Sequence, residues 1–150
     1  MVKRSAGLLL FRTTNGFVEV FLVHPGGPFY TKKDLGVWSI PKGEFEAEEP
    51  FAAARREFEE ETGFRVAGEF IALPVIKQKG GKLVYAWAVE ADVDAAAIES
   101  NTFPMEWPPK SGKVQEFPEV DRAEWFDVET AKKKINPAQA ELIESMLKKI

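Results

Sequence analysis

The sequence predicts an α/β (α+β) fold in a single domain that spans residues 1–150. Three observations support this prediction. The chain has 150 residues, which is the length of one ordinary domain. Segments with the pattern of strands stand on both sides of one central helical segment, and further helical segments follow near the C-terminus. Strands mixed with helices in this way favour an α/β sandwich.

The N-terminal part of the chain is expected to form a β-hairpin. Residues 6–11 and 17–23 have the pattern of strands. The Asn15-Gly16 pair between them is a strong signal for a tight hairpin turn. Residues 24–29, which are rich in proline and glycine, are expected to form a loop.

The central helix is the clearest element of the pattern. A short strand at 37–40 and a loop at 42–49 are expected before it. Pro50 suits the first turn of a helix, residues 51–62 form its body, and Gly63 stands where a terminating glycine is expected. Three apolar residues at helical spacing predict one buried stripe: Phe51, Ala54 and Phe58.

The segment after the helix is expected to be extended over 64–77, with a bend at Pro74. Residues 82–90 give the clearest later strand. Residues 92–107 fit neither a helix nor a strand pattern clearly, and residues 107–113 are expected to form a loop.

The C-terminal part is expected to form one strand and two helices. Residues 124–128 are predicted as a strand and 129–135 as a short helix. Asn136 is expected to cap the last helix, with Pro137 in its first turn and Gln139 in a capping-box-like arrangement.

The composition excludes several classes of protein. The formal net charge of −4 gives no reason to expect binding to nucleic acid or to an anionic membrane. The chain has no cysteine and a single histidine, His24, so thiol chemistry and a multi-histidine metal centre are excluded. No apolar run is long enough for a transmembrane helix or a signal peptide, and a cytoplasmic location is expected.

A cluster of carboxylates on the central helix is the first sign of chemistry. At about 100° per residue, Glu57, Glu60 and Glu61 share an arc of roughly 100°, whereas Glu59 points away. Arg56 stands one turn before Glu60 and is expected to pair with it. Clustered carboxylates repel each other unless cations lie between them, and their hard oxygens suit Mg²⁺ or Mn²⁺. From charge alone, a solvated acidic helix face is the commoner explanation.

The surrounding sequence favours the metal site over that alternative. Residues 41–64 resemble the Nudix box, G-x5-E-x7-R-E-U-x-E-E-x-G-U, in which U is a bulky apolar residue. Residues 56–64 match its second half throughout, and Gly43 matches its first glycine. Counting back from Arg56 puts the isolated glutamate at Glu48, although Glu49 could take its place. Because four residues separate Gly43 from Glu48 instead of five, we infer a one-residue deletion in this loop.

The resemblance to the Nudix hydrolase family extends beyond the box. Residues 5–7 and 22–24 resemble the strands that precede the box in these domains. Residues 119–126, in which a glutamate precedes a Trp-Phe pair by six residues, are similar to a later segment of dinucleoside polyphosphate hydrolases. The resemblance therefore implies the Nudix fold, a mixed β-sheet sandwiched between helices.

The resemblance implies a role for each residue of the box. The metal ligands would be Glu57, Glu60 and Glu61, together with the backbone carbonyl near Lys42 or Gly43. The general base would be Glu57 or Glu119, with Glu116 as a weaker candidate, and Arg56 completes the catalytic set. Glu48 is expected to be structural.

The candidates for substrate binding are less specific. Lys42 and Arg4 are expected to contact phosphate, and Lys110 and Lys113 are weaker candidates. His24 is expected to be a structural residue at the end of a strand. The aromatic residues that could stack on a nucleobase, although each is more often a core residue, are Phe29, Tyr30, Trp38, Trp87 and Trp107.

The implied function is hydrolysis of a diphosphate linkage by water, with Mg²⁺ or Mn²⁺ as cofactor. The expected substrate is a nucleoside triphosphate or a dinucleoside polyphosphate. The alternatives are another diphosphate substrate (a nucleotide sugar, ADP-ribose or an RNA cap) and a non-catalytic, nucleotide-sensing Nudix domain. A small-molecule nucleotide or polyphosphate is the only partner expected, in a monomer or a homodimer.

Overall fold

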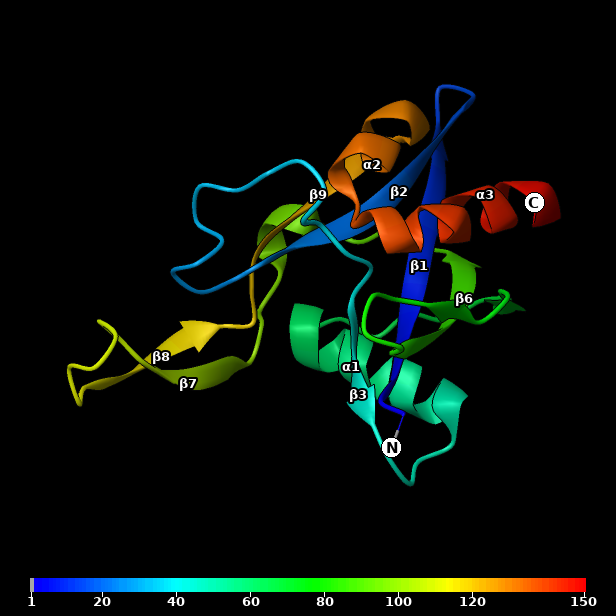
Figure 1. Ribbon diagram of the computed structural model, residues 1–150. Helices are drawn as coiled ribbons and strands as arrows, with labels where there is room; N and C mark the ends of the chain where they lie inside the picture. The colour runs from blue at the N-terminus through cyan, green and yellow to red at the C-terminus, as the bar shows by residue number, and fades with distance from the viewer. Residues whose placement is uncertain (1) are drawn as a thin grey trace.

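The computed structural model describes residues 2–150, and its centre is a mixed seven-stranded sheet (Figure 1). Five strands follow the order β4-β6-β1-β2-β9, while β3 pairs with β1 and β5 pairs with β6. The strands of this sheet are β1 (Arg4–Thr14), β2 (Phe17–Pro25), β3 (Lys42–Phe45), β4 (Ile71–Ala72), β5 (Ile76–Lys77), β6 (Leu83–Glu90) and β9 (Val120–Asp127).

Strand β1 is the axis of the sheet. It pairs in parallel with β6 along one edge, and antiparallel with β3 and then β2 along the other. Because side chains alternate across a strand, β1 contributes to two separate cores. Leu9 and Phe11 belong to the core on one face, and Ala6, Leu8 and Leu10 belong to the core on the other.

Helices cover both faces, which confirms the predicted sandwich. Helix α1 (Pro50–Thr62) packs Ala54 and Phe58 into one core, while α2 (Val128–Lys134) and α3 (Ala140–Lys149) cover the opposite face (Figure 1). Two short 3₁₀ turns, η1 (Ala95–Ala97) and η2 (Pro137–Gln139), complete the helical elements. Within residues 2–150 no helix has the length and apolarity needed to cross a membrane.

Helix α1 begins and ends where the sequence predicts. The side chain of Glu49 caps its start by accepting a hydrogen bond from the Ala52 N–H at 3.0 Å, and Pro50 follows in the first turn. Gly63 ends the helix with a φ of 80°, a left-handed conformation that favours glycine. Both ends are therefore fixed locally, which sets the direction of the carboxylates between them.

A second, smaller sheet begins in the segment 92–107 that the sequence left ambiguous, and its other strand follows the predicted loop. Strands β7 (Thr102–Glu106) and β8 (Val114–Pro118) form a hairpin that extends away from the main sheet (Figure 1). The predicted loop at 107–113 is confirmed as its turn. Glu119 is the single residue between β8 and β9, so the base of this hairpin determines where Glu119 lies.

Three local predictions were wrong in part. The predicted loop at 42–49 begins with strand β3, because its backbone pairs with Arg4–Gly7 of β1. The predicted strand at 37–40 forms only two single bridges, at Trp38 and Ser39. Gln139 does not form the predicted capping box: it precedes α3 without a side-chain capping hydrogen bond, and its buried side chain accepts a hydrogen bond from the Ile40 N–H at 3.1 Å.

Candidate active site

The box carboxylates lie where the predicted helix geometry puts them. Glu57 and Glu61 are both only 8% exposed, on the side of α1 that meets the sheet. The Glu60 side chain, next to them, remains 40% exposed. Glu59 points away and forms an ion pair with Arg65 at 2.7 Å. The predicted arc of three carboxylates is therefore present at the edge of the core.

Arg56 holds this cluster in place through a network of ion pairs. Its Nη1 donates to Glu57 at 2.9 Å and to Glu60 at 3.1 Å, which confirms the predicted pairing with Glu60. Its Nε and Nη2 donate to Glu48, at 2.9 and 2.5 Å. These partners raise the pKa of Arg56, with Glu48 the largest contributor. Glu48 thus anchors the loop to Arg56 despite the shortened spacing.

Gly43 explains why the box begins with a glycine. A Cβ atom at this position would lie 1.9 Å from the Glu57 Oε2 atom, so any side chain would displace the carboxylate. The backbone N–H of the preceding residue, Lys42, donates to Glu61 at 3.3 Å. Strand β3 therefore brings its backbone directly against two of the buried carboxylates.

Glu119 joins the box carboxylates from a distant part of the sequence. Its N–H donates to the Asn101 carbonyl at 2.9 Å, and the Asn101 N–H donates to the Glu60 carbonyl at 2.9 Å. On its other side, the Glu119 carbonyl accepts from the Gly26 N–H at 2.9 Å. We call Glu57, Glu60, Glu61 and Glu119 together the carboxylate site.

Like charges at this site shift the pKa values of its members. Burial, followed by the charges of Glu119 and Glu57, raises the pKa of Glu61 to about 8. Burial is also the largest cause that raises the pKa of Glu57 and that of Glu119, and the charge of Glu60 adds to both. Each shift reflects the cost of gathering negative charge away from water.

The donor set fits a hard divalent cation, which would relieve this repulsion. Across residues 2–150, however, the acidic side chains do not converge on one point as a ready-made group of three ligands. Arg56 draws Glu57 and Glu60 to itself, while Glu61 turns toward the Lys42 N–H. The carboxylates are thus close neighbours that would reorient to share a cation.

The two predicted phosphate contacts lie at the border of this site. Lys42 is half-buried, and burial, followed by the charge of Lys82, lowers its pKa. Arg4 stacks on the Phe45 ring, with 4.5 Å between Cζ and the ring centroid, and donates to the Glu46 carbonyl. Arg4 and Arg56 line one cavity of about 680 Å³.

Several weaker candidates have structural roles or lie elsewhere. Trp38 is fully buried, so the idea that it stacks on a base was wrong. His24 is also fully buried, and its ring lies 2.8 Å from an Asp121 oxygen and 2.7 Å from the Lys33 carbonyl, as expected of a structural residue. Trp87 packs against Phe51, with 5.2 Å between ring centroids.

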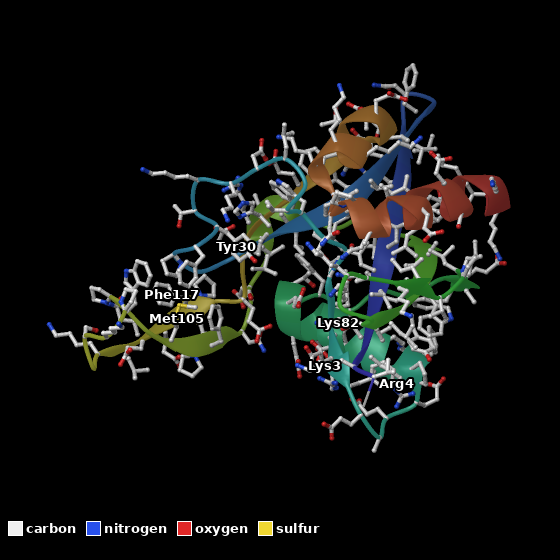
Figure 2. All side chains as sticks on the ribbon, in the orientation of Figure 1. Lys3, Arg4, Tyr30, Lys82, Met105 and Phe117 are labelled. Carbon is white, nitrogen blue, oxygen red and sulfur yellow. The ribbon has the colours of Figure 1, made fainter. Side chains whose placement is uncertain are left out.

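The other weaker candidates lie on or beside the hairpin. Lys110 and Lys113 are in its turn, and Glu116 is exposed on β8. Phe29 packs edge-on against Trp107, with 5.4 Å between ring centroids. Tyr30 lies on the same loop as Phe29, above Phe117 of the hairpin in the view of Figure 2. These aromatic side chains therefore lie at the hairpin and the loop beside it, not among the box carboxylates.

The sequence analysis missed the part that Gly26 plays. Besides donating to the Glu119 carbonyl, Gly26 packs so closely that a Cβ atom on it would lie 1.9 Å from the Pro118 carbonyl oxygen. In the sequence Gly26 is one glycine of a Pro/Gly loop, and its partner is more than 90 residues away. No local pattern marks such a contact.

This fold is that of a Nudix domain. A family model described as "NUDIX domain" matches residues 1–146, and the chain belongs to this family. The predicted resemblance to Nudix hydrolases is thereby confirmed at the level of the family.

Solved structures and one curated protein resemble the chain. An Ap4A hydrolase of C. elegans, solved as a binary complex, has a TM-score of 0.66 and 22% identity, over 98% of this chain and 96% of that one. The NUDIX domain of NrtR from Shewanella oneidensis, solved with ADP ribose, has a TM-score of 0.69 and 15% identity, over 99% and 88% of the two chains. These likenesses show the fold.

An octanoyltransferase of Myxococcus xanthus is 36% identical over 97 residues. The match covers 64% of this chain and 24% of that protein. The chain therefore spans about a quarter of this relative's length, and the relative's name describes a much longer protein.

Proposed function

We propose that the protein is a metal-dependent pyrophosphohydrolase that cleaves a diphosphate linkage by water attack at phosphorus. The observation that carries the proposal is the carboxylate site itself. Four glutamates from two distant segments lie together, with Glu57 against Gly43, although burial, followed by the charges of Glu119 and Glu57, raises the pKa of Glu61 to about 8. Such a costly arrangement is typical of a functional site.

Glu57, Glu60 and Glu61, with the Lys42–Gly43 backbone, would hold Mg²⁺ or Mn²⁺. When bound, the cation neutralises phosphate charge and makes a bound water more acidic. Arg56 orients two of the ligands through the hydrogen bonds that it donates to Glu57 and Glu60. Arg4 and Lys42, at the border of the site, would contact phosphate oxygens of the substrate.

Glu119 is the better of the two candidates for the general base. Arg56 already forms an ion pair with the Glu57 carboxylate, whereas among residues 2–150 Glu119 forms no ion pair. Its pKa is raised, so it accepts a proton more readily than an ordinary carboxylate. In the proposed reaction the water loses a proton to Glu119, its oxygen forms a new bond to phosphorus, and the bridging phosphorus–oxygen bond breaks.

We propose a nucleoside triphosphate or a dinucleoside polyphosphate as the substrate. The likeness to an Ap4A hydrolase and the position of Glu119 favour dinucleoside polyphosphates. ADP-ribose is the main alternative, because the NrtR NUDIX domain was solved with it. A purely sensing role is disfavoured because every box carboxylate is kept. We expect the protein to act in the cytoplasm, as a monomer or a homodimer.

A substrate screen tests this proposal. Purified protein would be incubated with Mg²⁺ and each of four substrates, and the products separated by chromatography: a nucleoside triphosphate, a dinucleoside polyphosphate, ADP-ribose and a nucleotide sugar. The Glu61→Gln variant serves as the blank. Cleavage of one class by the wild type alone supports a hydrolase and identifies its substrate. Absence of cleavage throughout would contradict hydrolysis of these nucleotides.

A further inference from the structure

A pocket rich in lysine lies beside the carboxylate site, at the end of the sheet where β1 begins. It has a volume of about 460 Å³ and is lined by Val2, Lys3, Lys77, Lys79, Gly80, Gly81 and Lys82. We call it the lysine pocket. Four of these seven residues are lysines and none is acidic, in a chain whose net charge is −4. The pocket is therefore a local site of positive potential.

The fold brings these lysines together from two segments, residues 2–3 and residues 77–82. The Lys3 carbonyl accepts a hydrogen bond from the Leu83 N–H at 2.9 Å, which joins the N-terminus to the start of β6. The Gln78 N–H donates to the Lys82 carbonyl at 2.7 Å and closes the turn between β5 and β6. Gly80 and Gly81 adopt φ values of 88° and 87° that allow this turn.

Three of the four ammonium groups have no ion-pair partner among residues 2–150. Lys82 pairs with Glu44 at 3.1 Å, whereas Lys3, Lys77 and Lys79 are exposed without a carboxylate within 4.0 Å. Ammonium groups that line one pocket repel each other, and an anion bound between them relieves that repulsion. The chemistry of the pocket is therefore suited to a ligand with several negative charges.

A neighbouring cavity of mixed charge, lined by Glu44, Glu46 and Glu48 as well as by basic residues, connects this pocket to the carboxylate site. The neighbouring cavity, which reaches Arg4 and Arg56, shares Val2 and Lys3 with the lysine pocket. Figure 2 shows Lys3, Arg4 and Lys82 at the end of the molecule where the N-terminus and α1 lie.

We propose that the lysine pocket binds phosphate groups beyond the diphosphate that is cut, so that the preferred substrate carries a phosphate-rich arm. The identity of the cut bond rests on the proposed function, whereas phosphate binding by the pocket does not. Lysine binds phosphate as a mobile point charge, and several lysines accommodate several phosphates. The arm is either a linear polyphosphate chain or a ring that bears several phosphates.

A binding experiment without metal tests the pocket separately from catalysis. Isothermal titration calorimetry in excess chelator would measure the affinity for inorganic tripolyphosphate and for inositol hexakisphosphate. The test variant is Lys77→Glu/Lys79→Glu. The matched control is Lys133→Glu/Lys149→Glu, which makes the same charge change at exposed lysines of α2 and α3.

The wild type and the control are expected to bind at least one anion, and the pocket variant to bind it at least about tenfold more weakly. Tighter binding of tripolyphosphate indicates a linear arm, and tighter binding of inositol hexakisphosphate a ring. Equal affinity in the pocket variant and the control, or no binding by the wild type, would overturn the proposal. Circular dichroism would verify that each variant is folded.

The outcome also separates this inference from the proposed function. A wild type that cleaves nucleotides yet binds neither anion would leave the hydrolase proposal standing and refute the lysine pocket. A wild type that binds an anion through the pocket but cleaves no nucleotide would support the pocket and contradict the proposed substrates. Glu61→Gln is expected to keep anion binding.

Discussion

The carboxylate site and the lysine pocket lie at the same end of β1, yet they are built in opposite ways. The carboxylate site gathers negative charge from helix α1 and from Glu119, with Glu57 and Glu61 buried, and Arg56 holds Glu57 and Glu60 through ion pairs. The lysine pocket gathers positive charge from two segments, and among residues 2–150 only its Lys82 forms an ion pair. The comparison teaches that a largely paired anionic centre and a largely unpaired cationic surface can lie side by side, and we propose that the first serves bond cleavage and the second substrate binding.

The largest expected effect comes from neutralising a buried member of the carboxylate site. Glu61→Gln is expected to lower kcat by roughly two to three orders of magnitude, because it removes one proposed metal ligand. Steady-state kinetics with Mg²⁺ would measure it. Glu59→Gln, on the same helix but paired with Arg65, is the control and is expected to retain activity. Wild-type turnover in Glu61→Gln would remove this residue from the mechanism.

Replacing Glu119 tests whether the site extends beyond the box. Glu119→Gln is expected to lower kcat by about a hundredfold or more, since a general base contributes roughly that much. Glu116→Gln changes an exposed glutamate of β8 and should have little effect. The acidic limb of the pH–rate profile should also disappear in Glu119→Gln. If that limb persists with normal turnover, Glu119 is not the base.

Changing Arg56 tests whether the rigidity of the carboxylate site matters. Arg56→Lys keeps the positive charge. Its single ammonium group, however, cannot donate hydrogen bonds to Glu48, Glu57 and Glu60 in the same fixed geometry. Loss of such a positioning residue is expected to weaken metal affinity and activity by about 10–100-fold. Excess Mn²⁺ should restore part of the activity. Unchanged metal affinity would show that charge alone, without the geometry, is sufficient.

The smallest expected effect is on how the free energy of unfolding depends on pH. It would be measured with a metal chelator present, so that no cation binds the carboxylates. The pKa of Glu61 is about 8 in the folded protein against an ordinary value of 4.5, so between these values the folded state binds the extra proton. The free energy of unfolding should therefore fall as pH rises from 4.5 to 8. Denaturant-induced unfolding would measure this free energy across the pH range. It should fall less in Glu61→Gln than in the exposed control Glu141→Gln. Equal falls would contradict the strained environment of Glu61.

What could be predicted from the sequence depended on whether the residues of a site are close together in the chain. The carboxylates of α1 could be placed because helix geometry relates residues three and four positions apart. Strand β3 could not, because its partner in β1 is almost 40 residues earlier and its polar sequence resembles a loop. The lysine pocket was missed for a similar reason: Lys3 and Lys79 come together only when β1 and β6 pair.

The site of Glu119 was predicted only by resemblance, and the contacts that fix it were not. Its backbone is held by Gly26 and Asn101, which belong to separate loops. The hairpin that positions it lies in a segment whose pattern favours neither helix nor strand. Long-range backbone hydrogen bonds of this kind leave no periodic signal in a sequence.

The central claim, that the carboxylate site binds a divalent cation, is tested most directly by titrating the protein with Mn²⁺ and following its electron paramagnetic resonance signal. Wild type and Glu59→Gln are expected to bind Mn²⁺ with equal affinity, Glu61→Gln to bind it at least about tenfold more weakly, and Mg²⁺ to compete for the same site. Equal Mn²⁺ affinity in all three proteins, or no binding by the wild type, would contradict the account.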